Sequence, residues 1–158
     1  MDCSYKLSEL ENVQAMQLHG RGARNTLIIL IFIGIILILA AIFTEYKIIA
    51  TGSVVGGVSG YFLVLFCLIP FNAKKQYKQN RALRNEITME ITEQGVNFKS
   101  ESGESKLKWS DIHKWKSSGE IYLLYITSNM FHMVPSRALP NEEMLEMLLN
   151  NNIGGKKA

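Results

Sequence analysis

Two uncharged, strongly apolar stretches dominate the hydrophobic pattern of the chain, residues 27–43 and residues 48–73. An α-helix rises about 1.5 Å per residue, so roughly 20 apolar residues cross a hydrocarbon layer about 30 Å thick. Residues 44–47 alone separate the two stretches, and so short a connection cannot return the chain across a membrane. We therefore expect a transmembrane helical hairpin at 26–73, with antiparallel spans at 26–44 and 48–72.

The polar segments on either side of this hairpin carry their own patterns. In the lead, residues 1–25, Ser8 and Glu11 have the spacing of a capping box, which predicts a helix start after a short strand at 3–7. Residues 74–85 are rich in helix-forming Lys, Arg, Gln, Ala and Leu, so we expect a basic juxtamembrane helix that continues the second span.

From residue 86 the pattern changes to the alternation of apolar and polar side chains that is typical of half-buried strands. It continues to residue 109, where Leu107 and Trp109 share one face of a third strand. Residues 121–126 are continuously apolar, which favours a central strand covered on both faces. We expect a β domain at 86–150.

The end of this β domain has the pattern of an amphipathic helix. Asn141 is placed to cap it, and Leu145, Leu148 and Leu149 share one side. Residues 151–158 are expected to form a flexible tail. The whole pattern predicts an α+β membrane protein, with a two-helix hairpin followed by a small, mostly antiparallel β domain with a C-terminal helix. The lead lies on the same side of the membrane, so whether it completes this domain stays open.

Charge predicts the orientation of the hairpin. Arg21 and Arg24 precede the first span, and the connection holds only Glu45 and Lys47. Five cations follow the second span: Lys74, Lys75, Lys78, Arg81 and Arg84. Lys and Arg beside a span are retained on the cytoplasmic side, so both termini should be cytoplasmic. The same five cations also suit anionic lipid headgroups, and the two roles are compatible. A nucleic-acid partner is not expected, because Tyr77 is the only aromatic residue among them.

Gly52, Gly56 and Gly60 recur every four residues and therefore lie on one stripe of the second span. A stripe without side chains lets another helix approach closely. The sequence leaves open whether that helix is the first span of the same chain or the hairpin of a second copy. No carboxylate or cation lies within either span, which argues against an ion or proton path.

The most distinctive side chains of the β domain are Trp109, Ile112 and Trp115. The alternation predicts that Trp109 lies in the core. Trp115 belongs to the same core motif but is closer to a turn, so whether it is exposed to a partner or the membrane stays open. We expect no enzyme activity, metal or cofactor, since His19, His113 and His132 are isolated from other ligands or bases. Cys3 and Cys67 are separated by the hairpin topology, so no disulfide is expected.

One run of residues resembles a known family. It consists of Gly103-Glu104-Ser105-x-Leu107-x-Trp109-Ser110-x-Ile112, Leu123-Leu124-Tyr125 and Pro135-Ser136-Arg137-Ala138. The run is similar to the YcxB-like family of bacterial membrane proteins. The resemblance implies a pleckstrin-homology-like (PH-like) domain and an address in the bacterial cytoplasmic (inner) membrane, and it marks Tyr125 and Pro135 as motif positions. Ser136 and Leu139 depart from the family pattern, which often has Lys and Phe there. The resemblance implies no established activity.

Two functions are compatible with these patterns. The first is a membrane-anchored cytoplasmic adaptor or regulatory module, without catalytic activity, that presents its domain to a protein partner or to lipid headgroups. The second is an accessory subunit of a transporter or another membrane complex that packs through Gly52, Gly56 and Gly60. The sequence names neither the partner nor the oligomeric state.

Overall fold

The first and last parts of the chain build one β domain. The computed structural model of the chain describes residues 2–21, 32–37, 39 and 47–153. In it β1 (Asp2–Lys6) pairs antiparallel with β2 (Glu86–Ile91), although both apolar stretches lie between these strands in sequence. β3 (Gly95–Ser100) and β4 (Gly103–Lys108) extend this sheet, with strand order β1-β2-β3-β4. The expected strand at 3–7 is therefore present, and it forms one edge of the sheet.

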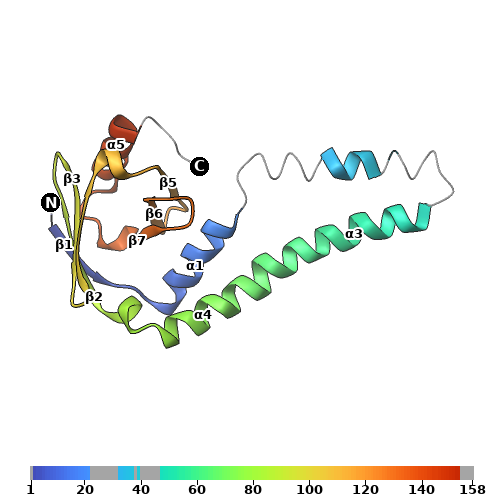
Figure 1. The fold of residues 1–158 in the computed structure, drawn as a ribbon, viewed down its shortest axis with the longest axis horizontal. Helices are drawn as coiled ribbons and strands as arrows, with labels where there is room; N and C mark the ends of the chain where they lie inside the picture. Colours follow the sequence, from blue (N-terminus) through green and yellow to red (C-terminus); the bar gives the residue numbers. More distant parts are fainter. Residues whose placement is uncertain (1, 22–31, 38, 40–46, 154–158) are drawn as a thin grey trace.

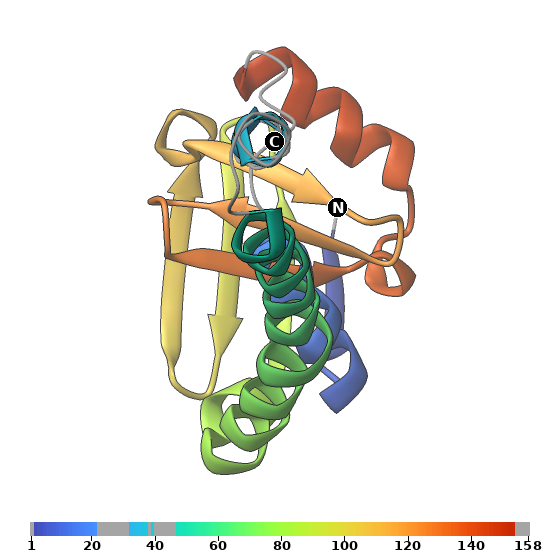
Figure 2. The same ribbon diagram turned by 90° about the vertical axis from the view of Figure 1, so that its right-hand side faces the viewer.

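A second antiparallel sheet contains β5 (Lys114–Ser117), β6 (Ile121–Tyr125) and β7 (Phe131–Pro135). β6 is its central strand and all of its residues are buried, as the continuous apolar run predicts. The strands of the two sheets cross, and α5 (Glu142–Ile153) lies over one end of them (Figure 2). The Met144 amide donates to Asn141 Oδ1 at 3.0 Å, which confirms the expected cap of α5.

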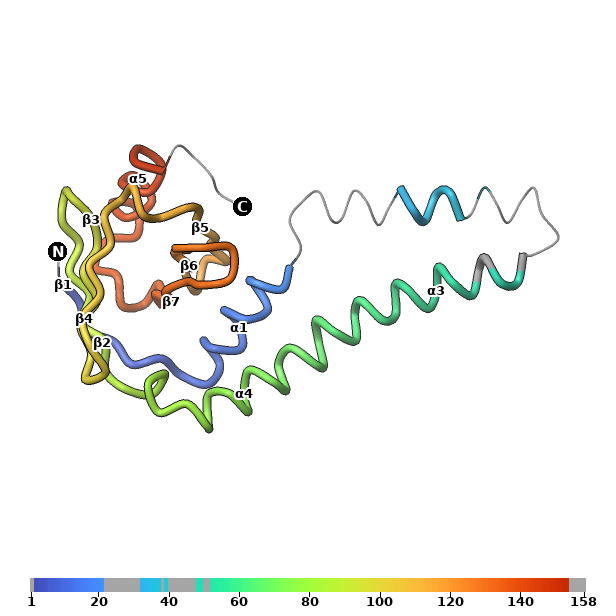
Figure 3. The backbone as a smooth tube through the Cα atoms, viewed as in Figure 1, coloured from blue at the N-terminus to red at the C-terminus, as the bar shows by residue number. Residues whose placement is uncertain are grey.

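One helix leads away from the sheets (Figure 3). It runs without interruption through α3 (Lys47–Leu63), the π-helical segment η1 (Val64–Leu68) and α4 (Ile69–Gln79), and we call it the long helix. α1 (Glu9–Gly20) begins with the expected capping box at Ser8 and lies beside α4 (Figure 1). The described residues also contain the 3-10 turns η2 (Arg81–Arg84), η3 (Trp109–Asp111) and η4 (Ser136–Ala138).

The core lies between the two sheets and under α1 and α5. Its buried side chains come from every layer and include Tyr5, Leu7, Ala15, Met89, Phe98, Trp109, Trp115, Leu123 and Leu145. Gly95 marks a close approach, because a Cβ there would overlap the Leu107 carbonyl of the neighbouring strand. The Tyr5 hydroxyl donates to the Met133 carbonyl at 2.8 Å and so joins the first sheet to the second.

Three local expectations differ from the structure, and one open question is decided by it. The basic helix ends at Gln79 rather than at 85, because Asn80 is extended and its side chain caps η2. Trp109 follows β4 and opens η3 instead of belonging to the strand. The exposure of Trp115 was open in the sequence, and the structure buries this residue fully because β5 packs it into the core. α5 continues to Ile153, a buried residue, so residues 151–153 belong to the helix, and the rest of the expected tail lies outside the described residues.

The α+β class is confirmed, with two antiparallel sheets and a C-terminal helix. Within the described residues one helical stretch, Gly52–Gln79, is long and apolar enough to cross a membrane. The first apolar stretch is described only at 32–37 and 39, where it is helical, and the rest of it lies outside the described residues. The two-span hairpin is therefore not confirmed.

Candidate functional site

The junction of α1 with α4 connects the β domain to the long helix. Asn12 Nδ2 donates to the Ala73 carbonyl at 2.9 Å, and this contact is buried. The Tyr77 hydroxyl donates to the Leu7 carbonyl at 2.8 Å, just before α1 begins. Asn12 of α1 thus binds the backbone of α4, and Tyr77 of α4 binds the backbone that leads into α1. Because hydrogen bonds are directional, these two contacts fix the relative position of the two helices.

A proline explains a third polar contact at this junction. The Ile69 amide donates to the Val64 carbonyl, the spacing of a π-helix. The next bond of this kind would join residue 70 to the Leu65 carbonyl, but Pro70 has no N–H. Gln17 of α1 supplies the donor instead, with Nε2 at 3.3 Å from the Leu65 oxygen.

The opposite side of α1 packs on the β5-β6-β7 sheet, and its C-terminal end is held by Lys116. The ammonium of this buried residue donates to the carbonyls of Leu18 (3.5 Å) and Arg21 (3.1 Å), where the helix dipole is negative. Burial, and then the charge of Lys114, lower the pKa of Lys116. α1 is therefore fixed on both sides, by the sheet and by the long helix.

The histidine of α1 belongs to this packing. His19 Nδ1 lies 3.0 Å from the Tyr125 hydroxyl, and its ring packs against Phe131. Burial, followed by the charges of Lys116 and Lys114, lowers the pKa of His19. These surroundings disfavour a charged imidazole and make His19 a packing residue of the junction.

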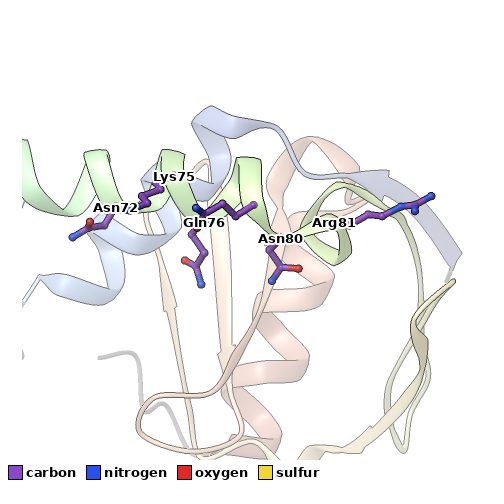
Figure 4. A pocket seen from close by; sticks show the side chains of 6 residues that line it. Asn72, Lys75, Gln76, Asn80 and Arg81 are labelled. Carbon is purple, nitrogen blue, oxygen red and sulfur yellow. The ribbon is translucent and has the colours of Figure 1, made fainter.

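The five cations after the apolar stretch separate into groups with different surroundings. Lys74 points to Glu9 of α1, with a distance of 3.9 Å from Nζ to the carboxylate. Lys75 and Arg81 line a hollow of about 430 Å³ on the outer side of α4 and η2. Its other lining residues are Asn72, Gln76, Gln79 and Asn80, and we call it the basic hollow. In Figure 4 the side chains of Asn72, Gln76 and Asn80 extend to the same side, whereas that of Arg81 extends away from them. Lys78 and Arg84 are exposed and lie outside its lining.

A second hollow, of about 360 Å³, lies where the start of α1 meets η4, and we call it the corner hollow. Its lining includes Leu10, Gln14, Glu120, Ser136 and Arg137. Leu10 is 65% exposed. Ser136 is 7% exposed, and within the described part of the chain its hydroxyl has no hydrogen-bond partner. The corner hollow therefore combines an exposed apolar side chain with an unused buried hydroxyl, an arrangement suited to contact with another molecule.

A bidentate ion pair forms the floor of the corner hollow. Arg137 Nε and Nη2 donate to the two carboxylate oxygens of Glu11 at 2.6 and 3.0 Å, and Nη2 also donates to the Lys6 carbonyl at 2.9 Å. Burial by itself would raise the pKa of Glu11, but the hydrogen bonds from Arg137 and Ser8 and the charge of Arg137 outweigh it and lower the pKa. The pair ties η4 to both β1 and α1.

The glycine stripe lies away from the described part of the first apolar stretch. Ile33, Gly34 and Leu37 share a cavity of about 150 Å³ with α3 residues that include Ser53 and Gly57. A Cβ built at Gly52, Gly56 or Gly60 would meet no heavy atom of the described residues within 4 Å. What packs against this stripe stays a prediction.

Comparison with known families adds one finding. The model of the YcxB-like protein family matches residues 91–150. The resemblance expected from the motifs is thereby confirmed for this segment, which runs from the end of β2 to α5. No curated protein and no solved structure matches the chain.

The YcxB-like segment contains all of the motif residues singled out from the sequence. Trp109, Ile112, Trp115, Tyr125 and Pro135 are all buried in it, so they build the domain core rather than a surface. β1, α1 and the long helix lie outside the matched segment. The junction and the basic hollow are therefore features of this chain outside the match, whereas the corner hollow combines residues from both parts.

Several residues of these sites were not singled out from the sequence. Asn12 and Gln17 looked like ordinary polar residues of a surface helix, and their partners are backbone carbonyls far away in sequence. Lys116 lies in a short strand between Trp115 and Ser117, and its partners are likewise backbone carbonyls far away in sequence. The one available signal was Pro70, which removes a donor within an apolar helix and requires a replacement from another element. No group of three or more His, Cys, Asp or Glu residues placed to hold a metal occurs among the described residues.

Proposed function

We propose that this protein is a membrane-anchored interaction module without catalytic activity. In this proposal the long helix crosses the bacterial cytoplasmic membrane and forms a two-span hairpin with residues 26–44, so that both termini are cytoplasmic. Support comes from the exposed apolar side chains of α3 and η1, from the cations that follow them, and from the cavity that residues 33–37 share with α3.

The observation that carries the proposal is the position of α1 between the second sheet and α4. Polar contacts fix this helix on both sides, through Asn12 and Gln17 to the long helix and through Lys116 to the sheet. A domain held in this way keeps one orientation relative to the membrane. A fixed orientation suits an adaptor, which must present the same surface to each partner, and a four-plus-three-strand core with a closing helix supports a PH-like interpretation.

The corner hollow is the surface that we assign to a protein partner. Its exposed Leu10, the buried hydroxyl of Ser136 and the charges of Arg137 and Glu120 provide apolar, polar and charged contacts within one concavity. The basic hollow is not assigned to a protein, because it lies beside the proposed membrane surface.

Site-specific photocrosslinking in intact cells tests this assignment. A photoreactive residue at Leu10 should give one discrete protein adduct, which Glu120→Lys should abolish. The control is Met130, which is 60% exposed on the β6–β7 connection and outside the corner hollow, and it should give no such adduct. Equal adducts from both positions, or none from Leu10, would contradict the proposed surface.

The alternative is an accessory subunit of a transporter or another membrane complex. It is favoured by the glycine stripe, since the described residues leave Gly52, Gly56 and Gly60 open to a close helix approach. A photoreactive residue at Val55 or Gly56 that crosslinks a membrane protein, while Leu10 remains unmodified, would favour this second function.

The topology has its own test. In a background with Cys3→Ser and Cys67→Ala, a membrane-impermeant thiol reagent should label Glu45→Cys in intact cells but not Ser105→Cys. Ser105 lies in β4, on the side of the proposed cytoplasmic domain. Labelling of Ser105→Cys without permeabilisation would remove the cytoplasmic orientation from the proposal.

A further inference from the structure

The outer face of the long helix changes from apolar to polar within one turn. Leu68 and Phe71 are 47% and 68% exposed, and the next residue, Asn72, is the first of the residues that line the basic hollow. α1 covers the other face, where Ala73 and Tyr77 lie. The exposed face therefore continues directly from an apolar surface to a polar one, as a helix does where it leaves the hydrocarbon layer.

The chemistry of the basic hollow suits an anion. Two cations, Lys75 and Arg81, contribute to it, and none of the described lining residues is acidic. The other lining side chains are primary amides, which donate hydrogen bonds to oxygen acceptors. Asn80 Oδ1 accepts the Ala82 amide at 3.0 Å, so the NH₂ group of Asn80 stays available as a donor.

The remaining cations show that this arrangement is more than general basicity. Lys74 is directed to Glu9, and Lys78 and Arg84 lie outside the lining although they belong to the same two elements. Charge beside a membrane is explained by topology alone. A cation, Lys75, beside four amides in one hollow, with the exposed Arg81 at its end and exposed Leu68 and Phe71 next to it, requires a further reason.

We propose that the basic hollow binds the phosphodiester headgroup of an anionic glycerophospholipid, with the acyl chains lying along Leu68 and Phe71. The phosphate oxygens accept from Lys75 and the amides, and from Arg81 once its exposed side chain turns toward the hollow. The tether to the acyl chains holds the headgroup at this depth. A free anion such as inorganic phosphate has the charge but nothing to occupy the apolar surface. This inference rests on the proposed membrane crossing and adds a ligand class to it.

Lipid selectivity of the full chain tests the inference. The chain is reconstituted in phosphatidylcholine bilayers with a trace of spin-labelled phosphatidylglycerol or spin-labelled phosphatidylcholine, and the motionally restricted fraction gives the relative association of each lipid. Wild type should prefer phosphatidylglycerol. Lys75→Gln with Arg81→Gln should reduce that preference by about tenfold or more, because it removes the two charge-assisted donors of the basic hollow.

Two matched variants make the result specific. Lys78→Gln with Arg84→Gln removes the same charge from the same elements and should change the preference less than twofold. Asn72→Leu with Gln76→Leu keeps the charge and should still weaken the preference, because it removes donors of the basic hollow. Equal losses from both charge pairs, or no effect of the amide variant, would show general surface attraction and overturn the site.

Inorganic phosphate at millimolar concentration separates the two possible sources of the anion. It should not displace the labelled lipid, and displacement would show a site for a soluble anion instead. Crosslinking from Leu10 monitors the proposed adaptor function in the same variants. If the lipid preference is lost while the Leu10 adduct is retained, the effect is confined to the basic hollow. If the adduct is missing while the lipid preference is intact, only the adaptor proposal is contradicted.

Discussion

At the scale of single residues, Trp109 illustrates how a side chain stabilises the domain through both packing and a hydrogen bond. It is buried at the start of η3, and its Nε1 donates to the Glu93 carbonyl at 3.0 Å. Trp109→Ala should lower the free energy of unfolding by about 3–5 kcal/mol, the range for a large aromatic residue removed from a core. Urea denaturation followed by the fluorescence of the remaining Trp115 measures the change. Met130→Ala, at an exposed position, is the control and should leave the midpoint where it is.

Glu11 gives the domain a defined sensitivity to acid. Its pKa is lowered in the folded protein from the ordinary value of 4.5, so the folded state holds its proton less tightly than the unfolded chain does. The stabilisation is thus fully present above pH 4.5 and is lost as the pH falls through the lower folded value. Glu11→Gln should flatten this acid limb of stability against pH. An acid limb identical in both proteins would show that the ion pair with Arg137 contributes nothing there.

At the scale of elements, the contact of α1 with η1 depends on Gln17, which supplies the hydrogen-bond donor that Pro70 lacks. Gln17→Leu leaves the Leu65 carbonyl without this donor and should cost about 1–3 kcal/mol of domain stability. Pro70→Ala restores a backbone N–H to the long helix. In that background Gln17→Leu should cost less, and a double-mutant cycle on urea midpoints measures the difference. Costs that simply add would show that Gln17 and Pro70 act independently.

At the scale of the whole molecule, the open glycine stripe decides between a single hairpin and an assembly. Gly56→Leu meets no described atom near its Cβ, so it should leave the β domain stable. If copies associate through the stripe, this substitution should shift them to monomers, because it holds the facing helix away. Oligomer size in mild detergent, for wild type and Gly56→Leu, measures this. Gly57→Leu is the control and should leave the oligomer size unchanged, because Gly57 lies outside the stripe and lines the cavity shared with Ile33 and Gly34. A wild type that is monomeric at all concentrations removes the association.

The candidate sites were only partly predictable, and particular residues show why. The basic run was visible in the sequence, but its division into Lys74 toward Glu9, and Lys75 with Arg81 in the basic hollow, depends on which face of α4 carries α1. The sequence left the exposure of Trp115 open because it is close to a turn, and the tertiary structure decides the question, since β5 packs it inward. The pair of Arg137 with Glu11 joins residues from opposite ends of the chain. Local patterns contain no information about such distant partners.

The sequence alone determined those elements that follow from the local pattern of apolar and polar residues. Alternation specified β2, continuous apolarity specified the doubly covered β6, and Ser8 with Glu11 specified the start of α1, since each is a local requirement of backbone or burial. Only the tertiary structure decided that β1 pairs with β2 across the apolar stretches and that α1 lies between the sheet and the long helix. The physical reason is that a hydrophobic pattern shows that a face must be buried, whereas the burying partner depends on contacts between segments that are distant in sequence.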